Sequence, residues 1–224
     1  MNPAWYTASL KPLEDAKRMD RALACISPER RRRALDMPEG LRRRQCVGAE
    51  LLLRRALEEH GLDASVISYT YGPHGKPYLA SHPGVFFSLS HSAGHVICAL
   101  GSREVGCDIE QIRPVDLRLA RRFFDPMEYE DILAAGSPQA QLERFFWYWT
   151  LKESFLKACG KGLHLPMKDF RIQEDAGKIA VQTRTGGPAF SFFSCREADC
   201  CCALCSEADC ETPELVRLDL GEVF

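Results

Sequence analysis

The sequence predicts an α+β fold made of two similar halves, each with helices packed on a small antiparallel sheet. Two helical regions end at glycines, Gly61 and Gly160, and short strand patterns follow each of them. A weak internal echo links GAELLLRRAL (48–57) with WTLKESFLKA (149–158), where an acidic residue precedes cationic residues in a bulky helix. Related halves of this kind are expected to face each other across a site. We place the N-terminal half at 1–104 and the C-terminal half at 105–224.

The N-terminal half begins with a short strand pattern at Trp5–Leu10. A helix is expected after Ser27, because serine caps helices well and Pro28 suits the first turn. Helical spacing continues to Gly61, with a break at 37–40 and one apolar face in the second piece. The remaining expected elements are strands at 66–71, 85–89 and 95–100, with loops at 72–77 and 90–94.

The C-terminal half opens with a strand pattern at 104–110. Gly160 is expected to stop the longest helix, because glycine adopts the left-handed conformation that often ends helices. The expected helices span 117–124, 126–134 and 138–159, and the expected antiparallel strands span 170–173, 178–183, 190–198, 201–207 and 215–218.

Composition narrows the class of protein. The chain has 224 residues, of which 46% are hydrophobic and 27% charged, as in ordinary globular proteins. No apolar run approaches the roughly 20 residues that a membrane span needs, and no basic start with an apolar core marks a secretory signal. We therefore expect a cytoplasmic protein without a membrane partner. The net charge of −2 argues against a nucleic-acid-binding module.

Arginines concentrate in one region of this acidic chain. Between Arg30 and Arg55 there are nine arginines and three acidic residues. A solvated pair of helices accounts for such a charge run. That interpretation is the more frequent one for charge runs, and a local site for phosphate groups is the alternative, because guanidinium groups bind phosphate with two parallel hydrogen bonds. The composition alone leaves both interpretations open.

Six of the eleven cysteines gather near the C-terminus, at Cys195, Cys200, Cys201, Cys202, Cys205 and Cys210. Without a secretory signal, disulfides are not expected. Two of the six have zinc-site spacing, but no second pair or nearby histidine completes such a site. The segment is better interpreted as a hairpin in which cysteine serves as a small buried apolar residue.

The segment 105–110, VGCDIE, places two carboxylates on one strand. Because side chains alternate along a strand, Asp108 and Glu110 are expected on the same face. Two adjacent carboxylates repel each other unless a cation lies between them, and oxygen ligands suit Mg²⁺. An exposed strand end with two solvated acids is an equal alternative from this motif alone.

The helix at 138–159 carries a charged patch on an otherwise apolar surface. Glu153 and Lys157 lie one turn apart on one face, and Lys152 is adjacent. An ordinary surface ion pair has the same spacing. Aromatic and aliphatic residues cover much of the circumference, however, so the patch is expected to line a cleft. A third carboxylate for a metal and two cations for a diphosphate would explain it.

Ser90, His91 and Ser92 follow a predicted strand and have hydroxyl, ring and amide groups that can hold a phosphate. A capped turn with a structural histidine is the more frequent meaning of this pattern. The segment 75–77, Gly-Lys-Pro, is by itself only a turn.

Together these motifs resemble a known family, the large pseudo-dimeric 4′-phosphopantetheinyl transferases of the type that primes the surfactin peptide synthetase. The resemblance extends from about residue 27 to 170 and is most specific at an upstream GxDIE followed by WxxKESFxKxxGKGL. The motifs that carry it are GKPYL (75–79), FSLSHS (87–92), VGCDIE (105–110), RRFFDPMEYEDIL (121–133) and WTLKESFLKACGKGLHLP (149–166).

The resemblance implies an enzyme that transfers 4′-phosphopantetheine from coenzyme A to a serine of an apo acyl or peptidyl carrier protein, releasing adenosine 3′,5′-bisphosphate. It implies Mg²⁺ as cofactor, coenzyme A in the cleft between the halves, and a monomer, since the fused halves need no second copy. Asp108, Glu110 and Glu153 look like the metal ligands, and Glu153, Lys157 and Asp108 look like the catalytic residues. The implied coenzyme A contacts are Arg30, Arg33, Arg44, Lys76, Ser90, His91, Lys152 and Lys157. Glu128 matches an acidic position near the metal, with its role left open.

Two other classes remain for comparison. Another Mg²⁺-dependent nucleotide enzyme would be expected to carry a Gly-rich phosphate loop, and the sequence has no GxxxxGK[ST]. A non-enzymatic binder of carrier proteins derived from such an enzyme would be expected to have lost one of the reactive side chains, and Asp108, Glu110, Glu153 and Lys157 are all present. A nucleic-acid module would be expected to be basic overall, and this chain is net acidic. The sequence does not distinguish among carrier proteins.

Overall fold

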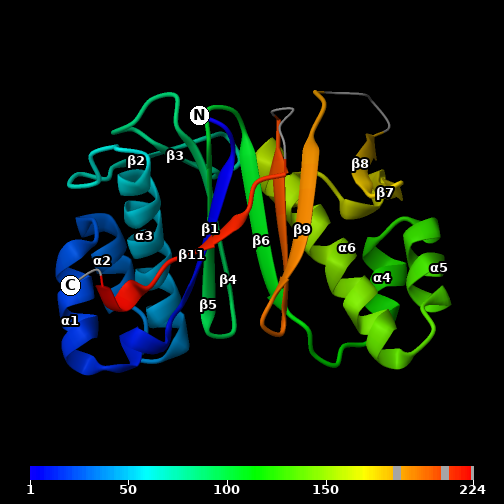
Figure 1. The fold of residues 1–224 in the computed structure, drawn as a ribbon, viewed down its shortest axis with the longest axis horizontal. Coiled ribbons are helices and arrows are strands. Elements are labelled where there is room, and N and C mark those ends of the chain that lie inside the picture. The colour runs from blue at the N-terminus through cyan, green and yellow to red at the C-terminus, as the bar shows by residue number, and fades with distance from the viewer. Residues whose placement is uncertain (184–187, 208–211, 223–224) are drawn as a thin grey trace.

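The computed structural model describes residues 1–183, 188–207 and 212–222. Helices gather at the two ends of the molecule, and the strands of two sheets lie between them (Figure 1). One end carries α1 to α3 and the other carries α4 to α6, so each sheet has its own helical layer (Figure 1). This is the α+β arrangement of two halves that the sequence predicts. Within the described residues, no helix combines the length and hydropathy needed to cross a membrane.

The N-terminal half is built on a four-stranded sheet in the order β11-β1-β5-β4. Its strands are β1 (Ala4–Ser9), β4 (Phe86–Ser92), β5 (His95–Gly101) and β11 (Leu215–Arg217), and its helices are α1 (Ala16–Cys25), α2 (Pro28–Leu35) and α3 (Leu41–Glu59). A separate pair of strands, β2 (Tyr69–Tyr71) and β3 (Pro77–Leu79), precedes β4. Neighbouring strands are antiparallel except β1 and β11, which are parallel.

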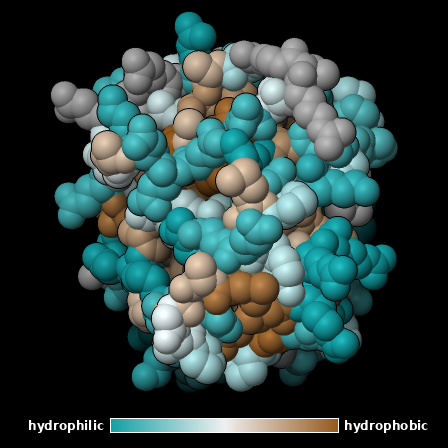
Figure 2. All heavy atoms as spheres, turned by 90° about the vertical axis from the view of Figure 1, so that its right-hand side faces the viewer, coloured by the Kyte–Doolittle hydropathy of each residue, from teal (hydrophilic) through white to brown (hydrophobic). Residues whose placement is uncertain are grey.

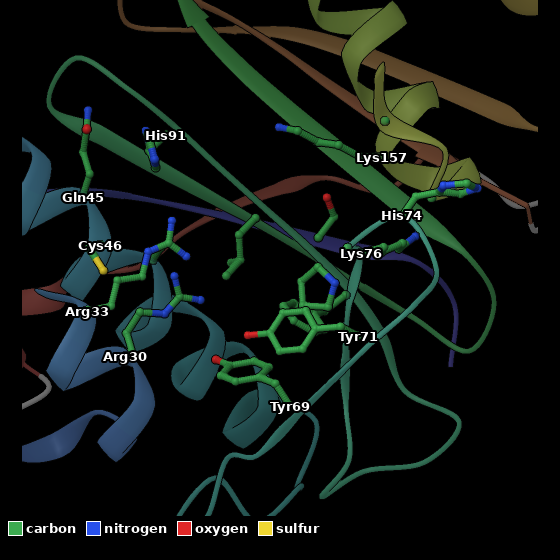
Figure 3. Close-up of a pocket in the computed structure, with 18 of the residues that line it drawn as sticks. Arg30, Arg33, Gln45, Cys46, Tyr69, Tyr71, His74, Lys76, His91 and Lys157 are labelled. Atoms are coloured by element: carbon green, nitrogen blue, oxygen red, sulfur yellow. The ribbon is translucent and has the colours of Figure 1, made fainter. Parts of the chain in front are cut away.

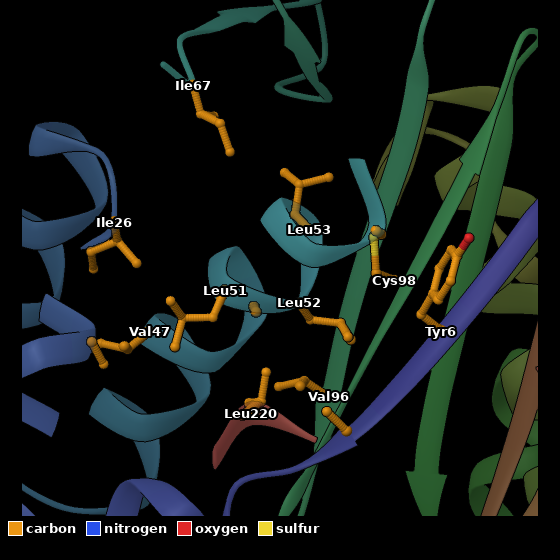
Figure 4. Packing of buried hydrophobic residues seen from close by; sticks show 14 of the residues in the cluster. Tyr6, Ile26, Val47, Leu51, Leu52, Leu53, Ile67, Val96, Cys98 and Leu220 are labelled. Atoms are coloured by element: carbon orange, nitrogen blue, oxygen red, sulfur yellow. The ribbon is translucent and has the colours of Figure 1, made fainter. Parts of the chain in front are cut away.

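Helix α3 provides the centre of the N-terminal core. Leu51, Leu52 and Leu53 are fully buried, and they lie between the other helices and the sheet (Figure 4). On the sheet side, Tyr6 and Val96 project towards α3 from β1 and β5 (Figure 4). This packing fixes the rotation of α3 about its axis, and therefore decides which of its polar residues face the interior of the molecule.

The C-terminal half is built on a three-stranded antiparallel sheet in the order β6-β10-β9. Its strands are β6 (Val105–Gln111), β9 (Ser191–Glu197) and β10 (Cys200–Ser206). A separate hairpin of β7 (Phe170–Asp175) and β8 (Lys178–Thr183) precedes β9 in the chain. Its helices are α4 (Arg118–Phe123), α5 (Pro126–Ala134) and α6 (Pro138–Cys159), and short 3₁₀ turns lie at Lys11–Glu14, Gly162–His164, Met167–Asp169 and Leu220–Glu222.

The two sheets meet along β4 and β6, where serine hydroxyls replace a backbone ladder. The Oγ atom of Ser88 accepts a hydrogen bond from the amide of Cys107 at 3.1 Å. Further along β4, the hydroxyls of Ser90 and Ser92 also contact β6. Ser90 Oγ donates to Asp108, and Ser92 Oγ accepts from the amide of Gln111 at 3.0 Å. The seam between the halves is therefore lined with hydroxyl groups, and it carries the acidic residues of β6.

Strand β6 lies unusually close to α6 because Gly106 has no side chain. A Cβ atom at this position would lie 1.9 Å from the carbonyl oxygen of Ser154 and 2.4 Å from the amide of Ala158. Both are backbone atoms of α6, so any larger residue would push the helix away from the strand. The glycine of the VGCDIE motif thus brings the carboxylates of β6 and the charged patch of α6 together.

Most of the predicted elements are confirmed, including the break between α2 and α3 and the end of α6 at Gly160, where φ is +64°. Helix α1 was missed, because its apolar face is short and its sequence is mostly polar. Strand β3 begins at the end of the loop expected at 72–77, and β4 continues through Ser92 into the loop expected at 90–94. The strand expected at 66–71 is confined to 69–71.

Strand β11 belongs to the first sheet although it lies in the second segment of the chain. The N-terminal sheet is therefore four-stranded and partly parallel, which differs from the small antiparallel sheet expected for each half. The division at 104/105 separates β5 from β6 but leaves β11 on the wrong side. As a division into domains it stays a prediction.

The cysteine-rich segment forms the expected hairpin of β9 and β10. Cys200, Cys202 and Cys205 are fully buried, and all ten cysteines in the described part of the chain are free thiols. Cys210 lies outside the described residues. The interpretation as small core residues is confirmed for Cys200, Cys201, Cys202 and Cys205, whereas Cys195 is only partly buried.

The outer face of the C-terminal half is mainly hydrophilic, with hydrophobic areas between the charged groups (Figure 2). Helices α4 and α5 expose four large apolar side chains, those of Leu119, Phe123, Met127 and Leu133.

Candidate active site

A pocket of about 670 Å³ opens between the two halves. Arginine side chains from α2 point into it from one side, and Lys157 from α6 lies on the opposite side (Figure 3). The polar and aromatic residues that line it are Arg30, Arg33, Arg42, Gln45, Tyr69, Tyr71, His74, Lys76, Phe87, Ser88, His91 and Lys157. Both halves contribute, as the sequence predicts for a site between them.

Asp108 is the most enclosed acid of the seam. Its Oδ1 atom accepts hydrogen bonds from Ser90 Oγ at 2.7 Å and from Lys157 Nζ at 2.7 Å. Its other oxygen, Oδ2, is buried and has no hydrogen-bond partner. A buried carboxylate oxygen without a donor is costly, so this atom is a candidate for binding a cation or a donor from a ligand.

Glu110 lies two residues further along the same strand face. Its Oε2 atom accepts a hydrogen bond from Ser92 Oγ at 3.0 Å. Burial raises the pKa of Glu110, and the charge of Asp108 raises it further. The two acids therefore lie close enough for their negative charges to repel each other, as the two-residue spacing predicts.

Glu153 on α6 is the third acid at the seam. Burial raises the pKa of Glu153 to about 7, and Asp108 and Glu110 add to the rise while Lys157 opposes it. A carboxylate with a pKa near neutrality can accept a proton efficiently at the pH of the cell. The shift arises because three acids from β6 and α6 share one partly buried region.

The acids fit a hard divalent cation by their chemistry. All three carry oxygen ligands, Asp108 raises the pKa of both Glu110 and Glu153, and Asp108 Oδ2 is buried without a partner. In the part of the chain that the structure describes, no three metal-binding side chains converge on a single point as the ligand shell of an ion. The ligand set Asp108, Glu110 and Glu153 therefore stays a prediction.

Lys157 provides the positive charge of the seam. Its Nζ atom donates to Asp108 and, at 3.1 Å, to the carbonyl oxygen of Cys107, while 30% of its side chain stays exposed in the pocket. Burial lowers the pKa of Lys157, but Asp108 and Cys107 raise it more, and the net shift is upward. The ammonium group thus remains charged beside the acids and accessible to a ligand.

Ser90 and His91 occupy the end of β4. Ser90 holds Asp108, whereas His91 is exposed and points into the pocket (Figure 3). Desolvation lowers the pKa of His91, and the positive charges of Lys157 and Arg30 contribute to the lowering. A neutral imidazole is therefore expected at pH 7, and it can donate one hydrogen bond to a ligand.

The arginine region divides into residues that reach the pocket and residues that do not. Arg30 and Arg33 line it from α2, and Arg42 lines it from α3. Arg44 does not line it, because its Nη2 atom is directed towards Glu14 Oε1, 3.7 Å away. Arg42 therefore lines the pocket where Arg44 was expected, and a contact between Arg44 and coenzyme A stays a prediction that this arrangement does not favour.

Several pocket residues were missed by sequence reasoning. Arg42 and Gln45 share one face of α3, since they lie three residues apart. Their spacing was visible in the sequence, but the direction of that face was not. Tyr69 and Tyr71, on β2, lie beside the arginines (Figure 3). Nothing in their local pattern distinguishes them from ordinary strand tyrosines.

Lys76 is present at the pocket, but its charge is already engaged. Its Nζ atom donates to Glu104 Oε2 at 2.5 Å and to the carbonyl oxygens of Val105 and Ala158 at 3.1 and 2.9 Å. Only 8% of its side chain is exposed. The ammonium group ties the 72–77 loop to the C-terminal half, so the part of Lys76 left to contact a ligand is its aliphatic stem and backbone.

Lys152 does not line the pocket, so its predicted contact with the diphosphate stays a prediction that its position does not favour. Its side chain is 0% exposed and forms an ion pair with Glu128 Oε2 at 2.8 Å. It also donates to the carbonyl oxygens of Met167 and Phe170 at 2.9 and 2.8 Å. The reason is the helical rotation of 100° per residue, which turns Lys152 into the C-terminal core when Glu153 faces the seam.

Glu128 likewise has a structural role away from the seam. Its Oε2 atom accepts from the amide of Asp125 at 3.0 Å, completing a capping box at the start of α5. Its Oε1 atom accepts from the amide of Ile172 at 2.7 Å. With both oxygens engaged and Lys152 as partner, Glu128 is not positioned near the acids of β6.

Replacing Lys152 with methionine tests this structural role. The change leaves Glu128 buried without its counter-ion, so the free energy of unfolding should fall by about 3–5 kcal/mol. Chemical denaturation of the parent and the variant measures this loss. In the fraction that stays folded, the KM for coenzyme A should be unchanged, because Lys152 does not reach the pocket. A selective rise in that KM would return Lys152 to the substrate site.

Comparison with solved structures finds holo-[acyl-carrier-protein] synthases. The crystal structure of the Thermotoga maritima enzyme has a TM-score of 0.40 and 23% sequence identity, covering 46% of this chain and 61% of that chain. A holo-ACP-synthase from Plasmodium yoelii also has a TM-score of 0.40, with 18% identity, covering 46% of this chain and 91% of that one.

Comparison of sequences covers more of the chain. The family model described as the 4′-phosphopantetheinyl transferase superfamily matches residues 104–205. A 4′-phosphopantetheinyl transferase of Bacillus subtilis is 37% identical over 171 residues, which is 75% of each chain. The 4′-phosphopantetheinyl transferase psf-1 of Bacillus pumilus is 32% identical over 206 residues, covering 85% of this chain and 88% of the relative. This chain therefore belongs to the 4′-phosphopantetheinyl transferase superfamily.

Proposed function

We propose that the pocket between the halves holds coenzyme A, with the arginines of α2 at its 3′-phosphate and its diphosphate beside Lys157. As a 4′-phosphopantetheinyl transferase, the chain moves the phosphopantetheine group of coenzyme A to a serine of an apo carrier protein. The observation that supports the assignment is one pocket lined by cationic groups of both halves, with Arg30, Arg33 and Arg42 at one side and Lys157 of α6 at the other.

The reaction begins with attack of the carrier serine on the β-phosphate, and adenosine 3′,5′-bisphosphate leaves. A serine hydroxyl is a weak nucleophile at neutral pH, so a base must take its proton. Glu153 is assigned this role because its pKa of about 7 matches the task. General base catalysis of this kind supplies on the order of 10²–10⁴ in rate.

Charge on the phosphates is balanced by residues of both halves. Lys157 offsets negative charge on the diphosphate as the leaving group departs, since its ammonium group is exposed in the pocket. Asp108, Glu110 and Glu153 would hold Mg²⁺, which neutralises phosphate oxygens when it is bound. Ser90 orients Asp108 through its hydroxyl, and His91 donates a hydrogen bond to a phosphate oxygen.

The direct test of the function is transfer to an apo carrier protein. Purified enzyme, coenzyme A, Mg²⁺ and an apo peptidyl or acyl carrier protein are incubated, and intact-mass spectrometry follows the carrier. The expected result is a mass increase equal to one phosphopantetheine group, lost when the carrier serine is replaced by alanine. Excess EDTA should stop the reaction and added Mg²⁺ should restore it. Full activity in EDTA would exclude the assigned metal requirement.

The arginine assignment predicts a selective change in the KM for coenzyme A. Arg33→Ala should raise it about tenfold or more, the effect of losing one charge-assisted contact. The turnover number kcat should change little, because the 3′-phosphate is remote from the reacting bond. Arg44→Ala is the matched control, because Arg44 faces Glu14 outside the pocket. Steady-state kinetics of both variants measures the effect.

The substrate 3′-dephospho-coenzyme A sharpens the same prediction, since it lacks the group that the arginines are assigned to bind. The parent and Arg33→Ala should have similar KM values for it. Equal losses with both substrates would show that Arg33 contributes to the pocket in some other way than by binding the 3′-phosphate.

We also propose that the enzyme acts as a cytoplasmic monomer on acyl or peptidyl carrier proteins, without nucleic acid or membrane partners. The two halves of one chain already form the pocket. The described cysteines are free thiols, which fits a reducing compartment. The −2 net charge is unsuited to general nucleic-acid binding.

A further inference from the structure

Glu50 on α3 is a fully buried carboxylate directly behind Arg30. Its side chain is 0% exposed, and its Oε2 atom lies 3.4 Å from Arg30 Nε. The same oxygen accepts hydrogen bonds from Ser27 Oγ and Tyr69 Oη, each at 2.9 Å, and Oε1 accepts from the amide of Ser27. We propose that Glu50 is a positioning residue that fixes the Arg30 guanidinium for the 3′-phosphate of coenzyme A, an inference that rests on the proposed function of the pocket.

The contact between Glu50 and Arg30 Nε determines the orientation of the guanidinium group. A guanidinium group is planar and carries its five donors in a fixed fork, so holding Nε also determines where the two terminal nitrogens point. Arg30 projects into the pocket beside Arg33 (Figure 3), and 17% of its side chain is exposed there. Its Cζ atom lies 5.7 Å from the centre of the Tyr69 ring, which limits rotation on a second side.

Pre-orientation matters because a free arginine side chain has many rotamers. Ordering such a side chain on binding reduces affinity, and a group already ordered by the protein avoids that loss. Arg33 provides an internal comparison. Among the described residues, no carboxylate forms an ion pair with it, and its side chain is exposed. The two arginines of α2 are therefore expected to differ in their dependence on Glu50.

A purely structural role for Glu50 is the alternative. Through Ser27, whose Oγ accepts from the amide of Arg30 at 3.3 Å, Glu50 also ties the start of α2 to α3. Loss of that tie would destabilise the protein without regard to the substrate. Only the positioning role predicts an effect that depends on whether the substrate carries a 3′-phosphate.

The test is Glu50→Gln, which keeps the size of the side chain and removes its charge. Its KM for coenzyme A should rise roughly threefold to tenfold, because an interaction with the charged guanidinium is weakened. Its kcat with coenzyme A, and its KM for 3′-dephospho-coenzyme A, should stay at the parent values. Equal KM changes with both substrates, or no change with either, would overturn the positioning role.

Coupling to Arg30 gives the second measurement. In an Arg30→Ala background, Glu50→Gln should add nothing to the KM for coenzyme A, whereas in an Arg33→Ala background it should keep its full effect. Additive effects in the Arg30→Ala background would mean that Glu50 acts without Arg30, which overturns the inference. If Arg30→Ala itself fails to distinguish coenzyme A from the dephospho form, the proposed 3′-phosphate site is wrong, which is a separate failure.

Glu50→Asp keeps the inference testable if Glu50→Gln does not fold. Aspartate keeps the negative charge in the buried network but draws it back from Arg30 by one methylene group. Thermal melting should then show a folded protein, and the KM should rise for coenzyme A only. A folded Glu50→Asp variant with parent kinetics for both substrates would overturn the role of Glu50 in positioning Arg30.

Discussion

Replacing Asp108 with asparagine is expected to lower kcat for transfer by a factor of about 10³ or more, the scale for losing a preorganised charged group at a phosphoryl centre. Asp108 is the acid that connects the halves, since its Oδ1 atom contacts both Ser90 of β4 and Lys157 of α6. Asparagine keeps the size and one carbonyl acceptor, so the seam should remain closed. Initial rates at saturating coenzyme A, carrier protein and Mg²⁺ measure the effect.

Binding of coenzyme A is the control for Asp108→Asn. Without metal, the affinity should be unchanged or higher, because a negative charge beside the diphosphate has been removed. Isothermal titration calorimetry in EDTA separates this from the loss of turnover. The ion pair with Lys157 is weakened, so a modest fall in thermal stability is expected as well. Near-normal turnover at saturating Mg²⁺ would remove Asp108 from the catalytic residues.

Glu153→Gln is expected to lower kcat by at least about 10², because glutamine has neither the negative charge nor the basicity of the carboxylate. The pH profile gives a signature that a structural defect would not produce. With a pKa of about 7, Glu153 is mostly protonated below that pH and cannot accept a proton from serine. At a low Mg²⁺ concentration the rate of the parent should therefore rise as the pH increases through about 7, and the variant should lack this rise.

Mg²⁺ should change the pH at which the rate of the parent rises. A bound cation favours the ionised form of Glu153, so raising the Mg²⁺ concentration should move the rise in kcat to lower pH. Rates measured across pH 7 at a low and a saturating Mg²⁺ concentration test this directly. An active Glu153→Gln variant with the parent profile would move the base to Glu110, because both Glu128 oxygens already accept backbone hydrogen bonds.

The core of the site was predictable because its residues are related by local geometry. Asp108 and Glu110 share a face through the two-residue period of β6, and Glu153 and Lys157 share a face through one turn of α6. These relations hold in any fold that keeps the strand and the helix. Gly106, which permits their close approach, was part of the motif that linked the chain to its family.

The residues whose positions could not be predicted from the sequence are those whose direction depends on the packing of distant elements. Arg44 faces Glu14 because burial of Leu51 and its neighbours sets the rotation of α3 against the sheet. Lys152 turns into the C-terminal core for the same kind of reason. Lys76 is held by Glu104 and, across the junction of the halves, by the carbonyl oxygens of Val105 and Ala158, all distant from it in the sequence.

The sequence by itself determined the α+β class, most helices and strands, the family, and the acids and lysine of the seam, since each rests on short-range periodicity or a contiguous motif. Only the tertiary structure decided that β11 completes the first sheet, that Arg42 replaces Arg44 in the pocket, and that Glu50 stands behind Arg30. The physical reason is that a side chain's partner across the fold depends on helix rotation and strand order. Both are set by burial of the whole core rather than by neighbouring residues.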